Sequence, residues 1–139
     1  MAAYCDRHEL EMLILPGPVP GAAEALGALR QAGHELVVVT ARTPRMRGMT
    51  EAWLAYHSIA VDGLHFLEGG SKAPLARAEG LDLLVEDAPH NALAVAEAGV
   101  RVLLYGAPYN RQVEHALITR CAGWAGVLEL IGNHRLHTA

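Results

Sequence analysis

The sequence has few cysteines, no run of basic residues and no apolar stretch of membrane-spanning length. Its two cysteines, Cys5 and Cys121, lie far apart and outside any metal-binding spacing, so we expect reduced thiols rather than a disulfide scaffold. A membrane span needs about 20 consecutive apolar residues, and the first residues carry charges where a signal peptide would be apolar. These absences predict a cytoplasmic protein that does not contact a membrane.

The charge of the chain argues against one class of partner. The formal net charge is −4, and lysines and arginines do not gather into a cluster. Proteins that bind nucleic-acid polymers need concentrated positive charge to contact the phosphates. We therefore expect no nucleic-acid polymer as a partner.

Apolar bursts alternate with amphipathic stretches along the 139 residues, of which 52% are hydrophobic. We expect helices at residues 22–33, 49–59, 73–80 and 91–99, and strands at residues 35–41, 63–68, 81–87 and 100–106. Strands that alternate with helices indicate a mostly parallel sheet with helices on its faces. The sequence predicts one α/β domain over residues 1–139, Rossmann-like and three-layered, mostly helical after Asn110, with residues 133–139 frayed.

Six candidate residues, five of them polar, lie where two of these strands end and where one helix begins. They are Thr40, Ala41, Arg42, Lys72, Glu86 and Asp87. In an open parallel sheet, ligands bind beyond the carboxyl ends of the strands. Hydroxyl and ammonium groups can hold phosphoryl oxygens, and carboxylates suit Mg²⁺. The first four residues are therefore candidates for binding phosphate, and the two acids are candidates for binding the metal.

Three segments resemble a known family of phosphohydrolases, the haloacid dehalogenase superfamily. VVVTAR, SKAPLA and LLVEDAPHNA resemble its motifs II, III and IV, in that order. Two further segments resemble the branch of 5'-nucleotidases and 5'(3')-deoxyribonucleotidases. They are the segment that precedes VVVTAR, and LLYGAPYNR followed by Trp124. The resemblance runs from about Pro20 to Leu130, and it implies the core fold of this superfamily without a full cap domain.

The resemblance also implies roles for individual residues. Thr40 would bind the transferring phosphate, Lys72 would stabilise its charge, and Asp87, together with Glu86, would hold Mg²⁺. The family's reaction hydrolyses a small phosphorylated molecule, such as a nucleotide, through an aspartyl-phosphate.

The sequence departs from the family at motif I, D-x-D-x-T/V, whose first aspartate attacks phosphorus. Asp6 is the only aspartate before Thr40. One interpretation aligns Asp6 with the nucleophile and His8 with the second acid. The other, which we favour, matches residues 1–15 to the end of a small helical cap, so that the chain begins after its nucleophile. The alternative to a phosphohydrolase is then a non-catalytic phosphate- or nucleotide-binding relative, for instance the product of a truncated gene.

A missing motif I strand would have a structural consequence. The strands on either side of it would keep unpaired backbone edges, which folded proteins avoid. We therefore expect that the chain can form a homodimer, for instance by strand exchange.

The predicted helix ends bear on the roles of three polar residues. Asp87 could cap the helix that begins near Pro89. Lys72 lies at a helix N-terminus, where the helix dipole disfavours a cation, and this mismatch favours a phosphate partner. Asn110 could cap the last helix or contact the substrate.

Overall fold

The structure is a computed structural model that describes residues 20–138 and the side chains of residues 20–132. Asp6, His8 and the expected cap remnant at residues 1–15 lie outside this part of the chain. The chain divides between Gly70 and Ser71 into two compact units, each of which is described by itself. A single domain over the whole chain stays a prediction.

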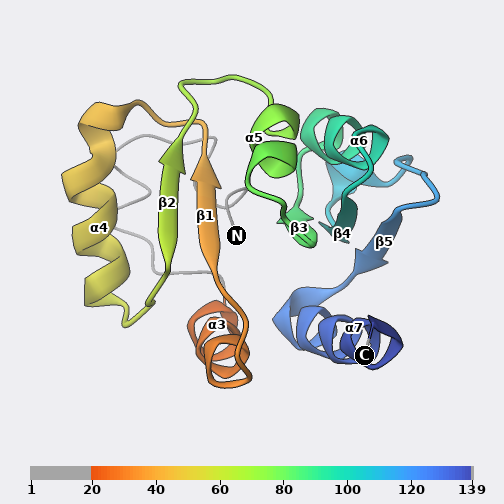
Figure 1. Ribbon diagram of the computed structural model, residues 1–139, viewed down its shortest axis with the longest axis horizontal. Helices are drawn as coiled ribbons and strands as arrows, with labels where there is room; N and C mark the ends of the chain where they lie inside the picture. Colours follow the sequence, from red (N-terminus) through yellow and green to blue (C-terminus); the bar gives the residue numbers. More distant parts are fainter. Residues whose placement is uncertain (1–19, 139) are drawn as a thin grey trace. The chain divides into compact units, whose positions relative to one another are not determined.

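Over residues 20–70, the first unit has a two-stranded parallel sheet and two α-helices (Figure 1). Its elements are α3 (Ala22–Gln31), β1 (Val37–Thr40), η1 (Pro44–Met46), α4 (Arg47–Tyr56) and β2 (Gly63–Phe66). Strands β1 and β2 run parallel in a register that places Thr40 beside Phe66. Helix α3 buries one face, formed by Ala22, Ala25, Leu26 and Leu29. Gly33 follows α3 with φ 95°, a conformation that glycine adopts readily, so it ends the helix as expected.

Asp62 fixes the entry to both strands of this unit. Its Oδ2 accepts a hydrogen bond from the Leu36 N–H at 2.8 Å, and its Oδ1 lies 2.7 Å from Nη2 of Arg30. The backbone hydrogen bond and then the Arg30 side chain hold the pKa of Asp62 below its usual value. The carboxylate therefore adds stability above its usual pKa, and this contribution is lost as the pH falls through the lowered value.

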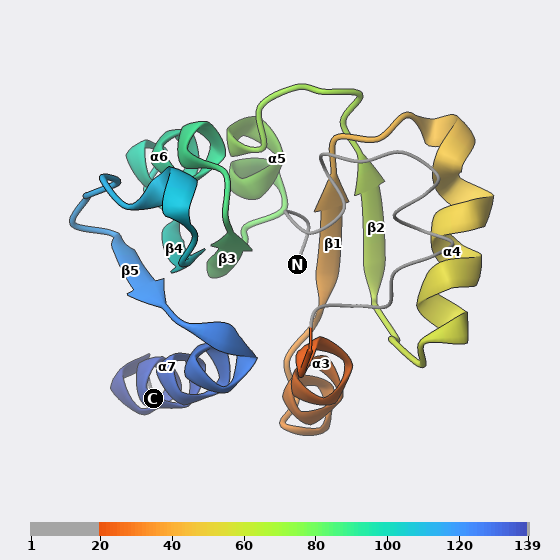
Figure 2. The same ribbon diagram turned by 180° about the vertical axis from the view of Figure 1, so that it is seen from behind.

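The second unit has a three-stranded parallel sheet in the order β3-β4-β5, seen from behind in Figure 2. Its elements are α5 (Ala73–Ala78), β3 (Leu83–Glu86), α6 (Pro89–Glu97), β4 (Arg101–Tyr105), η2 (Pro108–Asn110), β5 (Ile118–Cys121) and α7 (Gly123–Thr138). Its main hydrophobic cluster joins β4 to α6, because Leu104 and Val102 pack with Val95 and Ala92. All four of these side chains are buried.

The α/β class and the parallel pairing predicted from the sequence are confirmed. Each helix and strand expected before Asn110 is present, with shifted ends. The expectation that the chain is mostly helical after Asn110 is wrong, because β5 lies between η2 and α7. This strand is short and exposes Thr119 and Arg120, so it lacks the apolar run that revealed the other strands. Helix α7 continues to Thr138, and fraying of residues 133–139 stays a prediction.

Within the part of the chain that the structure describes, β1 pairs only with β2, and β3 pairs on one side only, with β4. Each of these two strands therefore has an edge with no strand partner among the described residues. Open edges are sites where another strand can add. We expect a homodimer in multi-angle light scattering. A monomeric mass up to high protein concentration would contradict pairing of these edges between chains.

Among the described residues, no helix is long and apolar enough to cross a lipid bilayer.

Candidate functional site

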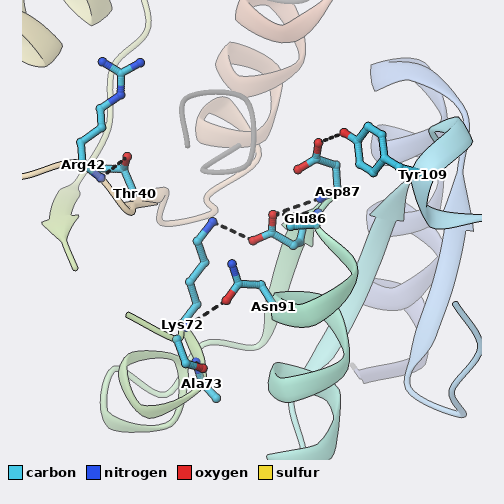
Figure 3. A network of polar contacts seen from close by, with 10 residues as sticks. Thr40, Arg42, Lys72, Ala73, Glu86, Asp87, Asn91 and Tyr109 are labelled. Carbon is cyan, nitrogen blue, oxygen red and sulfur yellow. Dashed lines mark hydrogen bonds and ion pairs between the residues drawn. The ribbon is translucent and has the colours of Figure 1, made fainter. Parts of the chain in front are cut away.

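A buried ion pair lies at the carboxyl end of β3 in the second unit (Figure 3). Lys72 Nζ is 2.7 Å from Glu86 Oε1. The Lys72 side chain is 1% exposed and the Glu86 side chain is 0% exposed. Removing two charges from water is costly, and the attraction between them offsets this cost only when their other polar atoms are also bonded.

The second oxygen of Glu86 is bonded to the backbone. Glu86 Oε2 accepts hydrogen bonds from the N–H of Asp87 at 3.1 Å and of Ala88 at 3.2 Å. Both oxygens of this carboxylate therefore have partners. The Glu86 carboxylate also explains why a cation lies at the start of α5. The position of Lys72 therefore does not by itself require a phosphate, and the inference of a phosphate partner from the helix dipole is wrong.

Asn91 holds the backbone of Lys72. The Lys72 N–H donates to Asn91 Oδ1 at 3.2 Å, and Asn91 is buried in the first turn of α6. The segment that carries the ammonium is thus tied to the helix that follows β3. Sequence analysis missed Asn91, although an amide directly before the apolar run ALAVA was a signal that could have revealed it.

The two oxygens of Asp87 differ in their surroundings. The Tyr109 hydroxyl donates to Asp87 Oδ2. Asp87 Oδ1 is buried, and no hydrogen-bond donor among the described residues reaches it. A buried acceptor without a partner carries a free-energy cost, so Oδ1 is a position where a cation or a donor would be stabilised.

The alternative role of Asp87 as a helix cap is wrong. Ala88 is the N-cap residue of α6, and no side chain caps this helix. The carboxylate of Asp87 instead meets Tyr109.

Thr40 is the last residue of β1 in the first unit, and Ala41 and Arg42 follow the strand. The Arg42 N–H donates to Thr40 Oγ1 at 3.2 Å, as Figure 3 shows. Thr40 and Arg42 are buried and Ala41 is half-buried. The Thr40 hydroxyl accepts this bond, and its own proton can be donated to an oxygen of a ligand. The structure thus groups these three residues in one unit and Lys72, Glu86 and Asp87 in the other.

Asn110 caps the short helix η2 and also reaches the end of β3. Its Oδ1 accepts from the Ala107 N–H at 3.0 Å, and its Nδ2 donates to the Asp87 and Tyr105 carbonyls at 2.9 Å each. The expectation that Asn110 caps the last helix is wrong, because α7 begins at Gly123. Asn110 belongs instead to the capping box of η2. Sequence analysis gave no role to Tyr109, whose partner Asp87 is distant in sequence.

The acids present could supply part of a metal site. No three His, Cys, Asp or Glu side chains gather into a metal-binding group among the described residues. Mg²⁺ keeps several waters and is often bound by one or two carboxylates plus the phosphate of a substrate. Asp87 Oδ1 fits one such ligand position, whereas both oxygens of Glu86 are already bonded.

Comparison with known proteins places the chain in a family. Residues 7–137 match the family model described as 5' nucleotidase, deoxy (pyrimidine), cytosolic type C protein. The chain belongs to this nucleotidase family. The resemblance to the nucleotidase branch of the haloacid dehalogenase superfamily, inferred from VVVTAR, SKAPLA and LLVEDAPHNA, is confirmed.

Curated relatives of this nucleotidase-family chain carry matching names. The chain is 29% identical over 117 residues to the protein named "Putative nucleotidase YqfW" of Bacillus subtilis (strain 168), covering 84% of this chain and 60% of the relative. It is 34% identical over 98 residues to "Nucleotidase CA_C3379" of Clostridium acetobutylicum, covering 70% of this chain and 51% of the relative. The chain thus spans between half and two thirds of the length of these relatives.

Two solved structures share the fold. One is D,D-heptose 1.7-bisphosphate phosphatase from B. bronchiseptica complexed with magnesium and phosphate, with a TM-score of 0.62, 21% identity and 84% of each chain covered. The other is a predicted phosphoglycolate phosphatase from Haemophilus somnus 129pt, with a TM-score of 0.60, 24% identity, and 81% of this chain and 56% of that chain covered. At these identities the likeness shows the fold alone, and it supports a Rossmann-like core.

Proposed function

We propose that this chain supplies the phosphate- and magnesium-binding residues of a phosphohydrolase that acts on a nucleotide or another small phosphomonoester. One observation carries the proposal. At the carboxyl end of β3, the buried Lys72–Glu86 pair lies next to Asp87, whose Oδ1 has no donor among the described residues. Membership of the nucleotidase family supports the same chemistry.

Each residue has a role in this proposal. Lys72, held by Glu86 and Asn91, would place positive charge beside a phosphoryl group, where water exclusion strengthens the attraction. Asp87 would hold Mg²⁺, which when bound supplies charge stabilisation to phosphoryl oxygens. For Thr40, with Ala41 and Arg42, phosphate binding rests on their place in motif II and on the burial of the Thr40 hydroxyl.

Hydrolysis through an aspartyl-phosphate also needs a nucleophile. Asp6 is the only aspartate before Thr40 in the sequence. Burial raises the pKa of the Cys121 thiol, so this thiol is protonated at neutral pH and is a poor substitute. The lack of a D-x-D motif favours a second candidate, a relative that binds a phosphorylated molecule without hydrolysing it.

A phosphate-release assay separates these functions. We expect the full chain to release phosphate from nucleoside monophosphates in Mg²⁺, and we expect EDTA to stop the reaction. If a group other than Asp6 attacks phosphorus, Asp6→Asn and the exposed control Asp82→Asn hydrolyse at the wild-type rate.

Two other results would change the assignment. Loss of turnover in Asp6→Asn alone would make Asp6 the nucleophile. A rise in melting temperature with nucleotide but no phosphate release would support the non-catalytic relative.

We also propose a cytoplasmic location, which the family's description as cytosolic supports. Sedimentation of the protein with membranes in cell fractionation would contradict it.

A further inference from the structure

The loop after β4 contacts Asp87 at two points. Asn110 Nδ2 donates to the Asp87 carbonyl at 2.9 Å, and the Tyr109 hydroxyl donates to Asp87 Oδ2. One contact fixes the main chain of Asp87, and the other fixes one oxygen of its carboxylate. Oδ1 is the oxygen that both contacts leave open.

Arg120 of β5 holds this loop with both ends of its guanidinium. Its Nη1 donates to Asn110 Oδ1 at 2.8 Å, and its Nη2 donates to the Asn110 carbonyl at 2.7 Å. A planar fork of this kind fixes position and angle together, which a lysine cannot do.

Gly106 lets the loop approach β5 closely. Its N–H donates to the Cys121 carbonyl at 2.9 Å, and a Cβ at this position would lie only 3.3 Å from the same oxygen. The loop is therefore fixed to β5 at both of its ends, by Gly106 and by Asn110.

The carboxamide of Asn110 is fully used inside the protein. Its two N–H groups bond the Asp87 and Tyr105 carbonyls, and its oxygen accepts from Ala107 and Arg120. An amide has two donors and two acceptor positions, so none remains for a ligand. Because Asn110 is also 1% exposed, it can act on a ligand only through the residues that it holds.

We propose that Asn110 and Arg120 are positioning residues that hold Asp87 with Oδ1 directed to the bound divalent cation. The inference rests on the proposed function, because it takes Asp87 as the metal ligand. Residues that orient a ligating carboxylate typically change metal affinity by about 10–100-fold when they are replaced.

Binding of Mn²⁺ to the full chain, measured by the electron paramagnetic resonance of the free ion, tests the proposal without relying on activity. We expect Asn110→Ala to weaken Mn²⁺ binding by about 10–100-fold. Arg120→Lys, which keeps the charge but loses the fork, is expected to weaken it by a smaller factor. Arg111→Ala removes an exposed arginine from the same segment and is expected to bind as wild type does.

The outcomes separate the inference from the proposed function. If wild type binds Mn²⁺ and Asp87→Asn does not, the proposed metal role of Asp87 stands. In that case, wild-type affinity in both Asn110→Ala and Arg120→Lys would overturn the inference. If wild type fails to bind, or Asp87→Asn binds equally well, the metal role of Asp87 falls and the inference falls with it.

Hydrogen exchange in the metal-free protein provides a second measurement for variants that lose stability. In Arg120→Lys we expect faster exchange of the Asp87 and Ala88 amides, while the Val102 amide in the core of the same sheet exchanges as in wild type. Wild-type exchange rates at Asp87 and Ala88 would overturn the inference. An equal increase in the exchange rate of Val102 would show that the whole sheet is destabilised, and it would also overturn the inference.

Discussion

Asp87→Asn is expected to lower Mg²⁺-dependent phosphate release by on the order of 100-fold or more. Asparagine keeps the size of the side chain and one carbonyl oxygen, but it removes the negative charge that a hard cation requires. Initial rates measured across a range of Mg²⁺ concentrations should show the loss most strongly at low Mg²⁺.

The matched control for this substitution is Asp82→Asn. Asp82 is an exposed aspartate just before β3, so the change has the same chemistry at a site that faces solvent. Its Mg²⁺ dependence should equal that of wild type. Equal rates in Asp87→Asn and wild type at every Mg²⁺ concentration would remove Asp87 from the metal site.

Glu86→Ala is expected to lower the free energy of unfolding by about 3–5 kcal/mol. The substitution leaves the ammonium of Lys72 buried without its carboxylate, and it removes the acceptor of the Asp87 and Ala88 amides. Urea unfolding followed by circular dichroism measures the change. The double variant Lys72→Met/Glu86→Leu should lose less than Glu86→Ala, because no unpaired charge remains in the interior.

The control for the buried pair is the exposed pair of the first unit. Arg30→Ala breaks the contact between Arg30 and Asp62, and exposed ion pairs contribute little because water and salt screen them. We expect a much smaller change than in Glu86→Ala. Equal changes in the two variants would mean that burial of the Lys72–Glu86 pair does not decide its effect.

The parts of the fold that could be predicted were those with a strong local signal. The three valines of β1 and the glycine after α3 are local features, and they placed these elements correctly. Strand β5 has no such feature, because two of its four residues are exposed. Its place is set by pairing with β4, which is a tertiary interaction that the local sequence does not encode.

The candidate site shows the same division. The positions of Lys72, Glu86 and Asp87 followed from the rule that ligands meet the carboxyl ends of parallel strands. The different partners of the two acids could not be predicted in this way, because they depend on which donors reach each carboxylate in the folded chain. Lys72 lies 14 residues before Glu86 and Tyr109 lies 22 residues after Asp87, so only folding brings each pair together.

The most direct test of the account locates a bound cation by nuclear magnetic resonance. Mn²⁺ broadens the signals of nearby amides, and low concentrations can be titrated into the ¹⁵N-labelled full chain. The account predicts that the Asp87 and Ala88 amides broaden first and that Asp87→Asn removes this effect. Broadening that begins instead at an exposed acid such as Asp82, with Asp87 unaffected, would contradict a metal site at the carboxyl end of β3.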